Sequence, residues 1–321
     1  MKNKLEEILS VLNTNNEVNL SIFLYQTRRN KNPERYKIYK MLIDAQIKNV
    51  MINVVKSEIK NFIELIEDND NKVLGYNPDL EQDIFMIKKS EIYFLKKIWP
   101  YLVEEEEPEI LEIEHFSNKN INRAWIVSVE YIRYGKEERI FLLQKFVKSQ
   151  HLTDKKIAVV YINNEYKLIS DKIVEIGRNF ETIILEDYII SKKLRDFEYI
   201  FEFEIFYKEK AGEFINEISN FDKIQIIDEV KEKILEKIKT NKKFAHKLYS
   251  AYRNGYYEYI DINKLKDLQK RLSLRINIKN EKIIIDDQTN LEDLLRVLND
   301  DFEKSLLTEN EYVVHKKEKL K

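Results

Sequence analysis

Glycine and proline are scarce in this chain, and their scarcity limits the kinds of fold that it can adopt. The 321 residues include only five glycines and four prolines. Because these two residue types interrupt helices and strands, so few of them favours long regular elements joined by plain loops. Hydrophobic residues make up 43% of the chain and aromatic residues 12%, enough to build a core in one large domain or two ordinary ones.

The same scarcity excludes several familiar sites. P-loops and dinucleotide folds need clustered glycines so that backbone N–H groups can approach phosphates, and no such cluster occurs. The Gly-x-Ser-x-Gly motif of α/β-hydrolases is also absent. The chain has no cysteine, which rules out disulfides, thiolate zinc sites and cysteine nucleophiles.

No apolar stretch approaches the roughly 18 residues of a membrane helix. The first apolar run is broken by Glu6 and Glu7, so we expect no signal peptide. Any membrane role is therefore expected to come through a partner.

The N-terminal third alternates between helical and strand patterns. Residues 2–12 are amphipathic, and 18–25 and 36–42 are strand-like. Apolar residues from Ile47 to Ile66 then follow the i, i+3, i+4 rhythm of a helix, with Asp44 as its start signal. A run of four glutamates followed by Pro108 predicts a boundary between an N-terminal α/β region, 1–103, and a second domain, 110–321.

The middle of the chain is rich in strands. Residues 124–146 predict a hairpin turning near Gly135, and 157–169 predict another turning at Asn163-Asn164. Residues 173–177 and 180–190 add further strands. Residues 196–219 are ambiguous, because odd positions from Phe197 to Tyr207 are apolar, as in a strand. Asp196 as an N-cap and a Glu204–Lys208 pair favour one helix instead.

Helices dominate the last third. Residues 227–239 and 244–252 predict helices, and Gly255 predicts a stop. Asp261 is expected to cap a helix through Arg271, followed by a hairpin turning at 279–281 and a last helix at 291–298. Strands in runs followed by helices in runs predict an α+β fold: a mostly antiparallel sheet flanked by helices, with a helical segment near the C-terminus.

Residues suited to metal or hydrolytic chemistry are isolated. The histidines at 115, 151, 246 and 315 have no ligand at metal spacing, so we interpret them as structural or surface residues. Glu202, Glu204 and Lys208 offer the best match to a metal-dependent nuclease, but their spacing is that of a helix ion pair. Asp286-Asp287 and Asp300-Asp301 are better explained as caps and turns. We expect no catalytic residue, metal or cofactor, although a degenerate nuclease stays open as an alternative.

The distribution of positive charge is more informative than the net charge of −2. Between Lys231 and Lys282 there are 15 Lys or Arg against six Asp or Glu, an excess of nine positive charges. Tyr249, Tyr252, Tyr256, Tyr257 and Tyr259 are interleaved with them, a mixture that can neutralise phosphates and stack unpaired bases. The DNA-binding candidates are Lys242, Lys243, Lys247, Arg253, Lys270, Arg271 and Arg275. The alternative is a charged helix face over a tyrosine-rich core.

Two blocks of sequence resemble the KwaB-like family of the Kiwa anti-phage defence system. One is a leucine-rich helix ending in Leu-Asn-Asp or similar, then Ser-x-Leu-Thr, a tyrosine and a basic finish. Here these are Leu294 to Asp300, Ser305-Leu306-Leu307-Thr308, Tyr312, Lys316 and Lys317. The other is "LEDYIISKKLRDFEYIF", with Asp187, Ile189, Ile190, Phe197, Glu198, Ile200 and Phe201 in the family pattern. The resemblance covers roughly residues 125–320, and Leu-Leu between Ser305 and Thr308 departs slightly from the common spacing.

The resemblance implies a cytoplasmic defence protein that binds DNA, phage DNA included, and assembles with a small KwaA-like membrane protein at the inner face of the cell membrane. It supplies no catalytic residues. We expect a homodimer, which the residues themselves do not fix. A metal-dependent nuclease effector and a non-enzymatic interaction scaffold remain the alternatives.

Overall fold

The computed structural model describes the chain except for residues 15–17, 29–35, 70–72, 77–82, 93–94, 104, 117–119, 148–157, 163–164, 170–173, 305–310 and 314–321. The chain divides into two compact units. The first extends from Met1 to Phe201, and the second begins at Glu202. The division therefore falls between Phe201 and Glu202 and does not coincide with the glutamate run.

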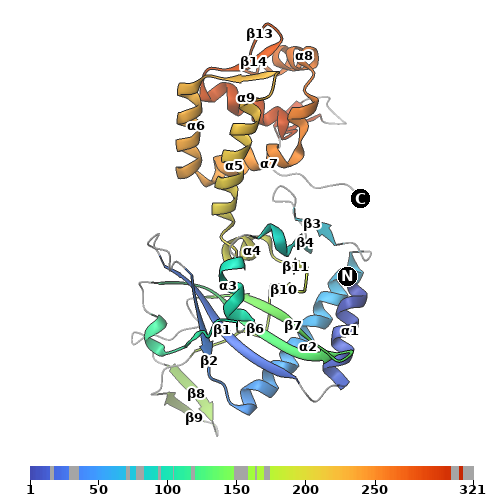
Figure 1. Cartoon of the computed structure of the whole chain (residues 1–321), viewed down its shortest axis with the longest axis vertical. Coiled ribbons are helices and arrows are strands. Elements are labelled where there is room, and N and C mark those ends of the chain that lie inside the picture. Colours follow the sequence, from blue (N-terminus) through green and yellow to red (C-terminus); the bar gives the residue numbers. More distant parts are fainter. Residues whose placement is uncertain are drawn as a thin grey trace. The chain divides into compact units, whose positions relative to one another are not determined.

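The first unit is built on one large sheet (Figure 1). Its nine strands lie in the order β3-β4-β11-β10-β7-β6-β1-β2-β5, and all neighbouring pairs are antiparallel except β3–β4 and β2–β5. The strands are β1 (Asn19–Arg28), β2 (Tyr36–Met41), β3 (Leu74–Gly75), β4 (Phe85–Lys88), β5 (Glu109–Ile110), β6 (Asn120–Arg133), β7 (Lys136–Lys145), β10 (Thr182–Ile184) and β11 (Tyr188–Ser191). A separate hairpin joins β8 (Ala158–Ile162) and β9 (Glu165–Ile169).

Long-range pairing explains why the glutamate run does not separate two compact units. Strand β1 precedes the run and β6 follows it, yet they pair along their lengths, with Phe23 opposite Ile126. Strand β6 then turns into β7 through Tyr134 and Gly135, both at positive φ, 50° and 74°. Two such residues form the tight turn that matches strand twist, so the expected hairpin at Gly135 is confirmed.

Helices cover both faces of the sheet. The helical elements of this unit are α1 (Lys2–Thr14), α2 (Ala45–Asp68), α3 (Leu95–Leu102), α4 (Leu194–Ile200) and the short turns η1 (Lys89–Glu91) and η2 (Ile113–Phe116). Alternate strand residues such as Ile22 and Val127 pack with buried residues of α1 and α2. The other face carries Phe141, whose ring lies 5.0 Å from Trp99 of α3. Asp44 caps α2 as expected, accepting from the Ile47 backbone N–H at 2.7 Å.

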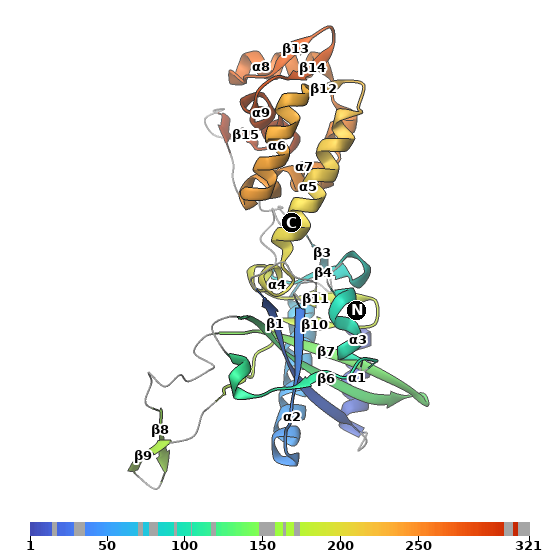
Figure 2. The ribbon, with the colours of Figure 1, turned by 60° about the vertical axis from the view of Figure 1, so that its left-hand side comes forward.

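The second unit is mainly helical (Figure 2). It comprises α5 (Phe203–Ser219), β12 (Ile224–Ile226), α6 (Asp228–Thr240), α7 (Lys242–Asn254), η4 (Tyr256–Tyr259), α8 (Ile262–Leu272), β13 (Asn277–Lys279), β14 (Lys282–Ile285), α9 (Gln288–Leu298), β15 (Phe302–Lys304) and β16 (Glu311–Val313). Strand β14 pairs in parallel with β12 and antiparallel with β13. The β13–β14 hairpin turns at Asn280 and Glu281, both at positive φ, within the expected turn.

Three local predictions are wrong. Residues 196–219 form two helices, because Glu202 has φ 46° and breaks the chain between α4 and α5. Asp196 lies inside α4 and not at its N-cap, which is Lys193. The described part of 173–177 holds a single bridge residue, Val174, and no strand. None of these features has a local sequence signal. The break at Glu202, for example, depends on packing, which holds this non-glycine residue at positive φ. The α+β class with a mostly antiparallel sheet is confirmed.

Candidate nucleic-acid interface

Helix α7 presents the first group of candidate cations. Asn241 caps it by accepting from the Phe244 backbone N–H at 3.0 Å, and Gly255 at φ 66° ends it. Phe244 and Leu248 are buried, so the helix packs on the core along that side. Lys242, Lys243, Lys247 and Arg253 are exposed. The amphipathic pattern thus places all four cations toward solvent.

The four cations of α7 follow two lines along the helix. Lys243 and Lys247 are four residues apart, so their Cβ atoms are neighbours at about 5–6 Å. Lys242 and Arg253 are eleven residues apart, about three full turns, and they return to nearly the same angle. A row of cations at this spacing can follow a nucleic-acid backbone, which carries a charge every few ångström.

The charges of α7 are largely uncommitted. Among the described residues, Lys243, Lys247 and Arg253 make no ion pair. Lys237 of α6 differs, because its Nζ lies 2.9 Å from Oε1 of Glu292 and over the ring of Phe244. Burial alone would raise the pKa of Glu292, but hydrogen bonds from Lys237 and Gln288 hold that pKa below its usual value. Glu292 is therefore a carboxylate that moderates the positive potential near Lys247.

Helix α8 presents a second group. Asp261 caps it as expected, accepting from the backbone N–H groups of Asn263 and Lys264. Lys270 and Arg271 are exposed in its last turn, where positive charges interact favourably with the helix dipole. Within the second unit, α7 and α8 lie at different ends in both views (Figures 1 and 2). The seven candidates therefore form two groups and not one continuous patch.

Two further lysines of α8 were missed by the sequence interpretation. Lys264 and Lys266 are exposed. Lys264 is seven residues before Arg271, and Lys266 is four before Lys270, so both pairs share a helix side. Their i, i+7 and i, i+4 spacing from Arg271 and Lys270 was the sequence signal that could have identified these two lysines.

Arg275 has a structural role that its position in the sequence does not reveal. It precedes β13, and it is exposed between buried Leu274 and Ile276. Its backbone N–H and its Nε donate to Oδ2 of Asp293 at 2.9 and 3.2 Å. Asp293 is 2% exposed and also accepts from Arg296 at 3.0 Å. Arg275 therefore compensates a buried carboxylate, although its side chain is 68% exposed.

The interleaved tyrosines separate into core and surface residues. Tyr249 and Tyr257 are buried and pack against Phe206 and Phe214 respectively. Tyr256 is 53% exposed and Tyr259 80% exposed, both in η4. Tyr256 and Tyr259 can therefore offer an open ring face to an unpaired base.

The carboxylates considered for a nuclease have structural roles. Glu204 and Lys208 form the expected i, i+4 ion pair at 2.7 Å on α5. Asp287 caps α9 in a capping box with Asn290. No group of three or more metal-ligating side chains occurs among the described residues.

The acidic doublet ends α9. The backbone N–H of Asp300 donates to Val297 and that of Asp301 to Arg296, with Asp300 at φ 53°. This pair of bonds is the Schellman motif, which satisfies the last carbonyls of a helix. The turn and basic tail expected beyond it, 305–310 and 316–317, lie outside the described residues.

Comparison with known proteins gives one match. A family model described as "Kiwa protein KwaB-like" matches residues 127–308, more than half of the chain. The matched range contains all seven candidate cations and runs past the acidic doublet. No curated protein and no solved structure matches the chain.

Proposed function

The chain belongs to the KwaB-like family of Kiwa proteins, components of an anti-phage defence system, and on that premise we propose that it is a non-catalytic DNA-binding protein. The observation that carries the proposal is the solvent-facing row of cations on α7. In the described part of the chain, Lys243, Lys247 and Arg253 have no carboxylate within ion-pair distance to neutralise them. Exposed cations that are not held in ion pairs can contact a phosphate backbone.

The chemistry of this face favours contacts with phosphates over contacts with base edges. Lysine is a compact point charge on a flexible stem, which suits phosphate better than bidentate base recognition. Tyr256 and Tyr259 would add sequence-tolerant stacking wherever strands are unpaired. We therefore expect binding that depends little on sequence, as a defence protein facing diverse phage genomes would need.

The first test is DNA binding as a function of salt. Affinity for two duplexes of unrelated sequence should be similar, and log K should fall linearly with log salt, with a slope of about −0.9 per neutralised phosphate. Strong preference for one duplex, or affinity that salt does not change, would contradict a phosphate-reading surface. Incubation with Mg²⁺ or Mn²⁺ should leave the DNA intact, and metal-dependent cleavage would favour the nuclease alternative.

The partner is expected to be a small KwaA-like membrane protein. No helix in the described portion of the chain is long and apolar enough to cross a membrane. Co-expression with such a partner should therefore move the protein into the membrane fraction, at the inner face of the cell membrane. The same fractionation without the partner is the control, and size-exclusion chromatography with light scattering tests the proposed homodimer.

A further inference from the structure

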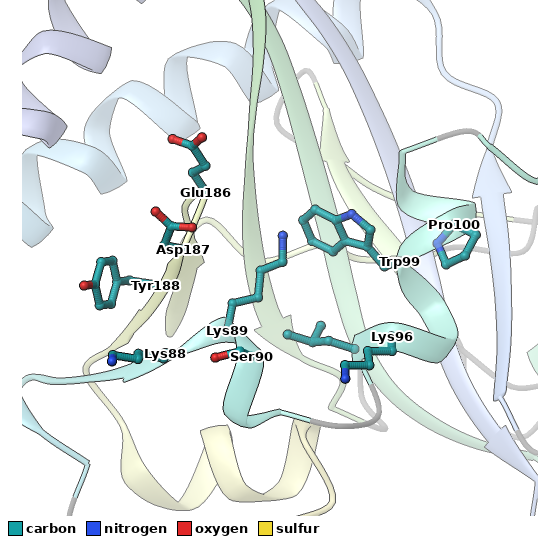
Figure 3. Close-up of a pocket in the computed structure, with 10 residues that line it drawn as sticks. Lys88, Lys89, Ser90, Lys96, Trp99, Pro100, Glu186, Asp187 and Tyr188 are labelled. Carbon is teal, nitrogen blue, oxygen red and sulfur yellow. The ribbon is translucent and has the colours of Figure 1, made fainter.

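A cavity of about 640 Å³ lies in the first unit (Figure 3), far in sequence from the cationic helices. Three segments form it: the end of β4 with η1, the helix α3, and the turn between β10 and β11. Its lining residues are Lys88, Lys89, Ser90, Leu95, Lys96, Trp99, Pro100, Glu186, Asp187 and Tyr188. This volume is within the usual range for small-molecule sites, about 300–1,000 Å³.

The walls of the cavity are held by the sheet. Lys88 pairs with Tyr188 in the β4–β11 ladder, and the Lys89 backbone N–H donates to the Asp187 carbonyl at 2.8 Å. Helix α3 buries Leu95, and its Trp99 ring meets Phe141 of β7 edge-on. The site is thus anchored to regular structure and is not confined to one loop.

Lys89 occupies the centre of the cavity. Figure 3 shows its side chain between the Trp99 ring and the Asp187 carboxylate. Its Nζ lies 3.4 Å from the centroid of the Trp99 ring, and within the described residues its ammonium makes no hydrogen bond or ion pair. An ammonium has three N–H donors, and here an aromatic face takes the place of their acceptors. Burial lowers the pKa of Lys89, although the charges of Asp187 and Glu186 oppose that shift.

The remaining surfaces of the cavity define what else a ligand must carry. Trp99, Leu95 and Pro100 form an apolar side suited to a flat ring. On the opposite side, Glu186 and Asp187 are exposed carboxylates that accept hydrogen bonds, and Lys4 reaches Glu186 at 3.4 Å. These carboxylates would repel a second anion but would accept from hydroxyl or amino groups.

We propose that this cavity binds a nucleotide, a small ligand that joins an anionic group, a planar ring and hydroxyl donors. The phosphate accepts from Lys89 and the Ser90 hydroxyl, with Lys88 and Lys96 at the rim. The ring packs along Trp99, and sugar hydroxyls or an exocyclic amine donate to Asp187 or Glu186. This site goes beyond the proposed DNA surface, since it lies in the other unit and uses none of its residues.

The two tryptophans make binding directly measurable. Trp125 is fully buried in the core, whereas Trp99 is only partly buried and lines the cavity. Ligand-dependent change in tryptophan fluorescence, excited at 295 nm, should therefore report on Trp99. We would titrate the full chain with AMP, adenosine, inorganic phosphate and vesicles of an anionic phospholipid. The AMP concentration that gives half-saturation should be at least tenfold lower than that of adenosine or phosphate, because only AMP carries the ring and the anion together.

A pair of lysine variants tests the assignment of the anion site. Lys89→Met keeps an apolar stem on Trp99 and removes the ammonium, so AMP affinity should fall about tenfold or more. Lys97→Met is the matched control, because Lys97 is an exposed lysine of α3, the helix that carries Trp99, and does not line the cavity. Melting temperatures of both variants check the fold, and calorimetric titration provides a second readout.

Three outcomes would overturn the proposal. They are the absence of saturable AMP binding to a folded wild-type protein, equal AMP binding by Lys89→Met, and binding of the vesicles alone. The last outcome would assign the cavity to a lipid headgroup. None of them bears on DNA binding by α7, so the two proposals can fail separately.

Discussion

The sheet of the first unit and the α7 face of the second use their positive charges differently. In the sheet unit, several cations pair with carboxylates: Arg133 with Glu138 at 2.7 Å, Lys145 with Asp196 at 2.6 Å and Lys192 with Glu58 at 2.8 Å. On α7, three of the four candidate cations make no ion pair among the described residues. The first arrangement ties strands and helices together, and the second leaves charge available for a partner. Local charge density alone does not distinguish these uses.

The largest loss of stability is expected when the ion pair between Glu58 and Lys192 is broken. Glu58 is 2% exposed and accepts from the Phe180 backbone N–H at 3.1 Å as well as from Lys192. Lys192→Met would leave this buried carboxylate without its cation, and we expect a loss of roughly 3 kcal/mol in the free energy of unfolding. Chemical denaturation measures it.

A surface pair provides the control for that variant. Lys37 and Glu109 lie 3.2 Å apart, and their side chains are 22% and 59% exposed. Lys37→Met should cost less than about 1 kcal/mol. If Lys192→Met and Lys37→Met lower the free energy of unfolding equally, burial does not decide how much an ion pair of the sheet unit contributes to stability.

The second unit also contains a buried ionic site, at Asp293, and breaking it should reduce stability less strongly. Asp293→Asn keeps the shape but removes the charge that Arg275 and Arg296 share. The side chains of these arginines are 68% and 39% exposed, so water can hydrate them, and we expect a loss of about 1–2 kcal/mol. A loss above that of Lys192→Met would contradict the comparison.

The smallest effect concerns Glu181. Burial raises the pKa of this carboxyl, against a hydrogen bond from the Lys145 backbone and the charge of Lys193. A raised carboxyl pKa means that the folded state binds the proton more tightly than the unfolded state does. The ionised form therefore destabilises the fold at neutral pH, and that penalty disappears as pH falls below the ordinary glutamate pKa. Glu181→Gln should stabilise the protein slightly near neutrality, and the gain should vanish in acid.

Stability curves of the Gln variant and the wild type at several pH values measure this difference. If the stability gain of Glu181→Gln grows as pH falls, the folded-state pKa of Glu181 is not raised, which would contradict this prediction. A constant difference would mean that the charge of Glu181 is not its source.

Local signals in the sequence predicted most individual elements. Asp44, Gly255 and Asp261 marked helix ends because capping depends on one or two neighbouring residues. The break at Glu202 had no such signal, because a glutamate at φ 46° is held by its tertiary surroundings. The place of β1 between β2 and β6 also depends on contacts distant in sequence.

The candidate site was predictable to a similar degree. The candidates Lys243 and Lys247 are exposed, but the sequence could not show that Tyr249 and Tyr257 are buried or that Arg275 is bonded to Asp293. The cavity around Lys89 could not be predicted, because β4, α3 and the β10–β11 turn meet only in the fold.

The central claim is that the exposed charge of α7 binds DNA, whereas exposed charge on the first unit does not. The most direct measurement compares two triple charge reversals in salt titrations of DNA binding. One is Lys242→Glu, Lys243→Glu and Lys247→Glu in α7. The other is Lys60→Glu, Lys97→Glu and Lys136→Glu, three exposed lysines of the first unit.

Both triple variants change the net charge equally and should melt near the wild-type temperature, since exposed charges contribute little to folding. The α7 variant should bind every duplex more weakly, and its slope of log K against log salt should be less steep by roughly 3. The first-unit variant should keep its slope and lose little affinity. If both lose affinity equally, net charge alone governs binding, and an unchanged slope in a folded α7 variant would show that α7 does not contact DNA.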